Sequence, residues 1–137
     1  MGLYLCVFDG DEELDGLEIG SYEDFGTLRD TVCERLERGV AGARFPTLML
    51  HSDCDGAWSV VDAMALLREL DVISTELGGL PAIALPAGWR REVARTMGLA
   101  PQNLCDCFFD VDGEPVIDRL AQLCRLAVER ELPILFQ

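Results

Sequence analysis

The segment 112-DGEPVIDRLAQLCRLAVERELPILFQ-137 carries the signals of a turn, a helix and a strand in immediate succession. Its opening Asp-Gly favours a turn, and Pro115 suits the first residue of a helix, where an N–H would lack an intrahelical partner. Apolar residues then recur at helical spacing and predict a buried face: Ile117, Leu120, Cys124 and Ala127. The closing LPILFQ is a short apolar run that predicts a strand.

The rest of the chain shows the same alternation of apolar runs and amphipathic segments. Runs at 2–8, 17–21, 45–52 and 104–111 predict strands, and helical patterns follow Ser21, follow Ser59 and span 87–97. Ser21 with Asp24, and Ser59 with Asp62, have capping-box spacing. We therefore predict a single domain over residues 1–137, of α+β or α/β class. It should hold a mixed sheet of about 4–5 strands packed with about 4 helices.

Length and composition favour a small soluble protein. With 137 residues, half of them apolar, the chain is long enough for one hydrophobic core. It contains no apolar run near the ~20 residues that a membrane span needs. Its first residues lack the basic start and cleavage site of a signal peptide, so we expect a cytoplasmic protein. The six cysteines are then expected to be free thiols.

The net charge of -14 is the strongest compositional signal. Such a field repels nucleic acid and anionic membranes, and it attracts basic partners. The acidic residues gather after the first strand: Asp9, Asp11, Glu12, Glu13 and Asp15. We interpret residues 9–16 as a loop tip that faces a basic partner. The alternative is a solvated loop that only maintains solubility.

This acidic stretch does not fit a calcium loop. Counted from Asp11, the twelfth position of an EF-hand would be Tyr22, and counted from Asp9 it would be Gly20. Neither residue supplies the bidentate carboxylate that the loop requires.

The octet 51-HSDCDGAW-58 holds the only histidine of the chain and is the main candidate for chemistry. His51 with Asp53 or Asp55 would form a base and its orienting group, and Cys54 would be a nucleophile. His51 and Cys54 lie within one turn, however, and the chain offers no second histidine and no phosphate-binding glycine loop. We therefore predict a structured strand-to-helix connection, held by His51 and its aspartates, that also contacts a partner. Trp58 either packs on the following helix or is exposed to that partner.

Zinc is the remaining chemical alternative. His51, Cys54, Cys105 and Cys107 are ligands of the right type, and whether they ever bind metal stays open. If 104–111 is a strand, Cys105 and Cys107 point to one face, most simply a core face. No catalytic residue and no cofactor is therefore assigned.

Several segments resemble the immunity protein 70 family of bacterial polymorphic-toxin systems. The similarity lies in MGLYLCVFDGDEELDGLEIGSYEDF at the start, in FPTLMLHSDCDGAWS, and in DCFFDVDGEP with the terminal LPILFQ. It implies a small cytosolic protein without enzymatic activity that binds and neutralises a cognate toxin domain, here a basic nuclease by its acidity. The residues expected to bind that partner are Asp9, Asp11, Glu12, Glu13, Asp15, His51, Asp53, Asp55 and Trp58.

Two other functions remain open at this point. One is a small metal-binding module or metal-assisted hydrolase that uses His51, Asp53, Cys54 and Asp55. The other is an acidic adaptor that forms a homodimer through an exposed strand.

Overall fold

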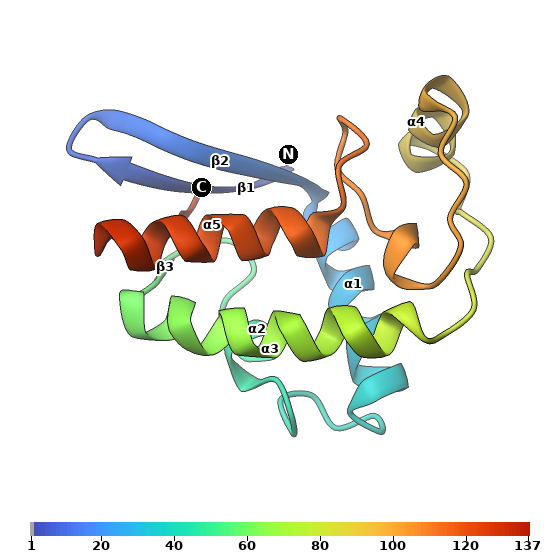
Figure 1. Cartoon of the computed structure of the whole chain (residues 1–137), viewed down its shortest axis with the longest axis horizontal. Coiled ribbons are helices and arrows are strands. Elements are labelled where there is room, and N and C mark those ends of the chain that lie inside the picture. The colour runs from blue at the N-terminus through green and yellow to red at the C-terminus, as the bar shows by residue number, and fades with distance from the viewer. Residues whose placement is uncertain (1) are drawn as a thin grey trace.

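The computed structural model describes residues 2–137 and has an α+β fold, as predicted (Figure 1). A 3₁₀ turn spans Cys105–Cys107. The other elements in chain order are β1 (Gly2–Asp9), β2 (Glu12–Ser21), α1 (Tyr22–Leu36), α2 (Pro46–Met49), β3 (Ala57–Trp58), α3 (Val60–Gly78), α4 (Trp89–Met97), α5 (Val116–Arg130) and β4 (Ile134–Phe136).

The strands form one sheet in the order β2-β1-β4-β3. Leu5 of β1 lies between Leu17 of β2 and Phe136 of β4, and Trp58 of β3 pairs with Ile134 of β4. Each of these pairs is antiparallel, whereas a mixed sheet was expected. The chain reaches β4 from α5 in a direction opposite to both of its neighbours, and this makes the sheet antiparallel throughout.

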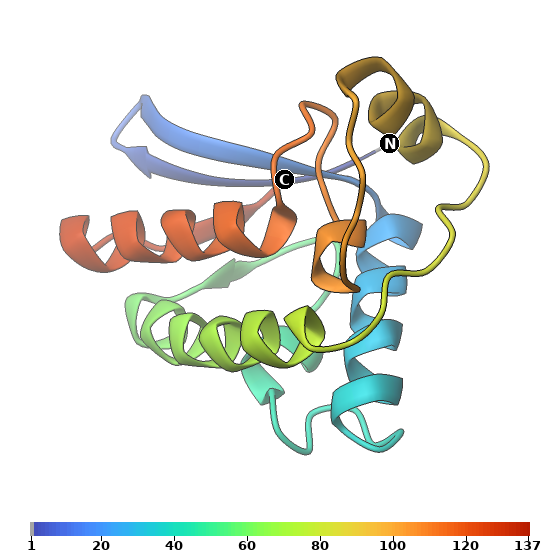
Figure 2. The ribbon, with the colours of Figure 1, turned by 45° about the vertical axis from the view of Figure 1, so that its right-hand side comes forward.

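Helices α1, α3 and α5 pack on one face of this sheet, with α5 next to the strands and α3 alongside α5, whereas α4 lies beyond one end of the sheet (Figures 1 and 2). The apolar positions that predicted helix faces are all buried in a common core: Phe25, Leu28, Val32 and Leu36 of α1, Ala63, Leu66, Leu70, Ile73 and Leu77 of α3, and Ile117, Leu120, Cys124 and Ala127 of α5. Helical spacing therefore identified the core side of each helix correctly.

Both predicted capping boxes are present. The Oγ of Ser21 accepts from the Asp24 N–H at 3.1 Å, and the Asp24 carboxylate accepts from the Ser21 N–H at 2.7 Å. Ser59 and Asp62 make the same reciprocal pair at the start of α3. Each box pairs backbone donors that a helix start leaves free, and so fixes where the helix begins.

The predicted strand at 45–52 is wrong. This segment instead forms the single helical turn α2 and a bend. Pro46 occupies the first turn, and the carboxylate of Glu69 on α3 accepts from the backbone N–H groups of Thr47 and Leu48. A short apolar run is compatible with a strand and with a buried helical turn. Here the Glu69 carboxylate, which is distant in the sequence, stabilises the helical turn.

The predicted strand at 104–111 is also wrong. The Asn103 side chain accepts from the Asp106 N–H and opens the 3₁₀ turn, after which Phe108 and Phe109 are buried. The extended pairing in this segment amounts to an isolated bridge from Phe109 to Pro115. The apolar residues of this segment are therefore buried without forming a strand of the sheet.

The acidic segment is a β-hairpin, whereas a loop over 9–16 was expected. Asp9 pairs with Glu12, so only Gly10 and Asp11 form the turn, and Gly10 has the positive φ of 62° that such a turn favours. Glu12 onward belongs to β2, an edge strand. Charged residues are well suited to an edge strand because they discourage pairing with other chains.

Candidate functional site

His51 is held by backbone carbonyls on both sides of its ring. Its Nε2 lies 2.9 Å from the Ala57 oxygen, and its Nδ1 lies 2.8 Å from the Ser52 oxygen. The ring stacks on Phe136 with centroids 4.2 Å apart. Each ring nitrogen therefore lies against a backbone carbonyl oxygen, and neither is directed at a nucleophile or at a set of metal ligands among residues 2–137. His51 therefore fixes the connection, as predicted for it.

Trp58 is fully buried beside His51. Its Nε1 donates to the Thr47 oxygen at 3.1 Å, and its ring meets Phe136 edge-on at 4.7 Å. The side chain therefore holds α2 against the sheet and is not exposed to a partner. Arg29 of α1 completes this anchor, because its guanidinium donates to the carbonyls of Leu48 and His51. Burial lowers the pKa of the Arg29 guanidinium, and the negative charge of the neighbouring Asp53 partly offsets this decrease in pKa.

The other polar side chains of the octet face solvent. Asp53, Cys54 and Asp55 are exposed. Neither aspartate makes a side-chain hydrogen bond with any residue from 2 to 137, so the expectation that they hold the turn is wrong. The Oγ of Ser52, which accepts from the Cys54 N–H at 3.3 Å, takes that role.

The zinc alternative has no ligand set in the described part of the chain. Among residues 2–137, no group of three or more His, Cys, Asp or Glu side chains is placed to hold a metal ion. Cys107 lies in the 3₁₀ turn, buried, with its Sγ 3.5 Å from the Asn103 oxygen. Cys105 is only partly buried, and burial raises the pKa of its thiol. The core assignment thus holds for Cys107 and only in part for Cys105.

The five carboxylates of the hairpin differ in how far they are neutralised. Asp15 points to the helix side, where the Arg119 guanidinium of α5 lies 3.2 Å from its Oδ1 and also donates to the Gly16 oxygen. Asp9 is 3.9 Å from Arg130, with both side chains about half exposed.

The remaining three hairpin carboxylates are open to solvent. Glu13 accepts from the Tyr4 hydroxyl at 2.6 Å, and this bond raises the Tyr4 pKa to about 12. Asp11 and Glu12 at the tip are exposed and have no side-chain bond or ion pair with another described residue. The tip therefore carries negative charge that no other residue from 2 to 137 neutralises.

The fold does not bring the two predicted partner-binding regions together. The hairpin occupies the β2 edge of the sheet, whereas the octet leads into β3 at the other edge. Two strands, β1 and β4, therefore separate β2 from β3.

Sequence reasoning missed a set of acids that are used inside the structure. Glu37 is buried and accepts from the backbone N–H groups of Gly42, Arg44 and Phe45. Asp24 binds the Trp89 indole at 3.1 Å and lies 3.3 Å from the buried guanidinium of Arg90. Only long-range packing reveals these roles, because in their own segments Glu37 looks like an ordinary surface residue and Asp24 like a capping residue alone.

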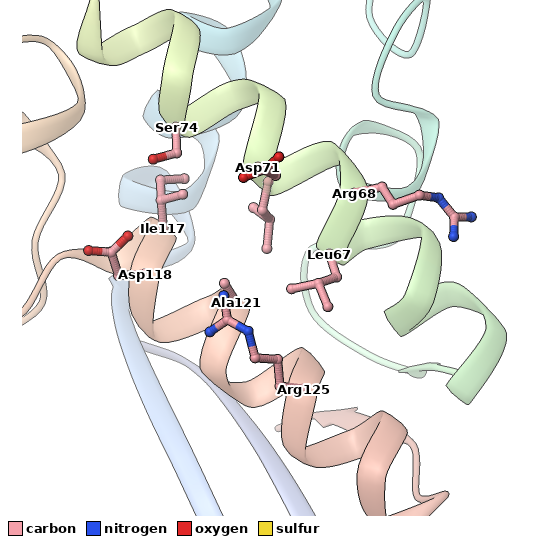
Figure 3. Close-up of a pocket in the computed structure, with 9 residues that line it drawn as sticks. Leu67, Arg68, Asp71, Ser74, Ile117, Asp118, Ala121 and Arg125 are labelled. Atoms are coloured by element: carbon pink, nitrogen blue, oxygen red, sulfur yellow. The ribbon is translucent and has the colours of Figure 1, made fainter.

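A groove of about 350 Å³ lies between α3 and α5 (Figure 3), and a hollow of about 630 Å³ lies at the β2 edge beside Tyr4, Glu18 and Arg119. The groove is lined by Leu67, Arg68, Leu70, Asp71, Ser74, Ile117, Asp118, Ala121 and Arg125. No hydrogen bond joins Ser74 to Asp71 or Asp118 in the described chain, and no histidine lines the groove, so nothing marks Ser74 as an activated nucleophile. None of the helices within residues 2–137 is long and apolar enough to cross a membrane.

One comparison with known proteins gives a match. A family model described as Immunity protein 70 matches residues 3–136. No curated protein and no solved structure matches the chain.

Proposed function

The chain belongs to the immunity protein 70 family, and from this membership we propose that it binds and neutralises one cognate polymorphic-toxin domain in the cytoplasm. Family membership supports the neutralisation of a toxin, without specifying which one. We further propose that the chain inhibits by binding alone and that the toxin is a basic nuclease.

The proposal of a basic nuclease rests on the charge of the β1–β2 hairpin. Asp11 and Glu12 are exposed at its tip without a compensating arginine, and the hairpin projects at one end of the molecule (Figure 1). Uncompensated like charges repel each other in the free protein, and a cationic partner relieves that repulsion. A nuclease presents cations to bind phosphate, so the same cations suit this hairpin.

The exposed carboxylates of the octet are a second proposed contact. Asp53 and Asp55 lie on a connection that His51 and Trp58 hold against the sheet. The two rings would act indirectly, by presenting the aspartates on a rigid support. A rigid loop loses less conformational entropy on binding than a mobile one.

Sequencing around the gene identifies candidate toxin domains, and co-expression of the chain with each of them tests the proposal. We expect the chain to restore growth of cells that make the toxin, and to form a one-to-one complex with the purified domain. DNA and RNA degradation by the toxin, with and without the chain, tests the nuclease assignment separately. Growth arrest that persists despite full expression of the chain would contradict neutralisation.

A charge variant with a matched control tests the role of the hairpin. Asp11→Asn with Glu12→Gln should slow association several-fold at low salt, and the difference should shrink as salt rises. Asp71→Asn with Asp118→Asn removes the same charge from the α3–α5 groove and should leave the rate within twofold. An equal effect of both double variants would assign the attraction to net charge and not to the hairpin.

A further inference from the structure

The sheet has a second face that the core does not use. Directly opposed residues of antiparallel strands share a face, and successive residues of a strand alternate between faces. Leu3, Leu5 and Val7 of β1 point into the core. The opposite face, here called the outer face, therefore consists of Glu13, Gly16 and Glu18 of β2, Tyr4, Cys6 and Phe8 of β1, Leu135 of β4 and Ala57 of β3.

No helix covers the outer face of the hairpin in either view of the molecule (Figures 1 and 2). Its apolar residues stand outside the core cluster, and Tyr4, Phe8 and Leu135 keep part of their surface exposed. The Tyr4 ring lies across Gly16, where a β-carbon would overlap the ring. Tyr4 is fixed in that position by its hydrogen bond to Glu13. The face is thus a preformed surface with aromatic rings at its centre.

Both charged residues of the outer face are acidic, although Arg119 of α5 lines the hollow at the β2 edge beside Tyr4 and Glu18. Glu13 and Glu18 line its β2 edge, and within residues 2–137 no arginine lies at ion-pairing distance from either carboxylate. All arginines of the chain lie outside the four strands. The two arginines that reach the hairpin, Arg119 and Arg130, pair with Asp15 and Asp9. The composition of the face therefore changes across the strands from acidic at β2 to aromatic at β1 and aliphatic at β4 and β3.

We infer that the outer face is where the cationic partner docks, with the hairpin tip steering its approach. The inference rests on the proposed function and deepens it by naming the surface and its chemistry. Arginine or lysine side chains of the partner would lay their aliphatic stems and charged groups over Tyr4 and Phe8, as cation–π contacts require. Their charged groups would then pair with Glu13 and Glu18.

The outer face has two properties that are typical of protein–protein interfaces, namely exposed aromatic residues and a charged rim. Aromatic residues, with their large area and few rotamers, are the side chains that contribute most to protein–protein affinity. A rim of one charge excludes partners of like charge and favours cationic ones. The helix side of the molecule differs, because its groove between α3 and α5 mixes Arg68 and Arg125 with Asp71 and Asp118.

Binding to the toxin domain that the chain neutralises in co-expression, measured by calorimetry, tests the inference. Glu18→Arg reverses an exposed charge on the outer face, and Phe8→Ala removes an aromatic ring. Asp71→Arg and Met64→Ala on α3 are the matched controls, since both wild-type side chains are exposed. We expect each outer-face variant to weaken binding tenfold or more and each control to stay within twofold. Circular dichroism confirms that every variant is folded.

Oxidative footprinting of the wild-type chain gives a result that does not depend on variants. Tyr4 and Phe8 should become protected from hydroxyl radicals in the complex, while Met64 stays reactive. The inference would be overturned if the wild type bound the toxin while Tyr4 and Phe8 stayed reactive and both outer-face variants bound with normal affinity. The proposed function would remain intact in that case. Protection of the rings in the chain alone, rising with concentration, would assign the face to a second copy and also overturn it. A wild-type chain that does not bind the toxin would contradict the proposed function itself, and the inference with it.

Discussion

Replacement of His51 should cost stability even though the residue has the appearance of a catalytic or metal-binding group. His51→Ala removes the hydrogen bond to the Ala57 oxygen and the stack on Phe136. A hydrogen bond contributes about 1 kcal/mol, and an aromatic pair contributes roughly 0.5–1.5 kcal/mol beyond burial. The Ala57 oxygen also loses its side-chain donor. We expect the free energy of unfolding to fall by about 2–3 kcal/mol.

Urea unfolding followed by tryptophan fluorescence measures this loss, because Trp58 packs 5.4 Å from the His51 ring. For a domain of this size the melting temperature should fall by about 3–4 °C per kcal/mol. His51→Phe preserves a ring on Phe136 but has no donor for the carbonyls, so it should recover about half of the loss. Asp53→Asn and Asp55→Asn are the matched controls and should change stability by less than about 0.5 kcal/mol, since both side chains are solvated.

The reasoning would be refuted if His51→Ala left stability unchanged while either aspartate variant lowered it by more than about 1 kcal/mol. The connection would then depend on the carboxylates, as the sequence alone had indicated. Saturable zinc binding by the wild type, lost in His51→Ala, would also contradict a purely structural histidine.

Three further outcomes follow from buried groups. In native protein, exposed Cys54 should react with a thiol reagent within minutes, whereas Cys107, which is 3% exposed, should react only on unfolding; equal rates would contradict its burial. Glu37→Ala leaves three backbone N–H groups without their acceptor and should lower the free energy of unfolding by about 2–4 kcal/mol in urea titrations. Burial raises the pKa of Asp24, but hydrogen bonds from Ser21 and Trp89 and the Arg90 charge together lower it below the ordinary carboxyl value. Its contribution is therefore complete above the unfolded carboxyl pKa of about 3.9 and is lost as pH falls through the lower folded value. The stability gap between wild type and Asp24→Asn should accordingly shrink below about pH 4, and a gap that widens there would reverse the sign.

Local signals located α1, α3 and α5, because each has a start signal and a periodic apolar face within its own residues, whereas the single turn α2 was expected to be part of a strand. Ser21 and Ser59 cap where their spacing to Asp24 and Asp62 indicated, and the apolar faces of α1, α3 and α5 are buried as expected. The strands were located less well. Residues 45–52 and 104–111 are rich in apolar side chains because they are buried, as strands often are. The conformation of the first segment depends on Glu69, and that of the second depends on the turn that Asn103 opens.

The sequence by itself determined that helices and strands occur together, as an α+β or α/β fold, where α1 and α3 begin, the acidic charge and, through its resemblance, the immunity family. These properties follow from composition and from patterns that lie within one segment. Only the tertiary structure decided that Trp58 is buried, that the His51 ring lies between two backbone carbonyls, and that Asp15 pairs with Arg119 while Asp11 makes no ion pair with any residue from 2 to 137. It also decided which face of the hairpin is left uncovered. Each of these outcomes depends on a partner from a distant segment, such as Phe136 or Arg119, and such partners meet only when the chain has folded.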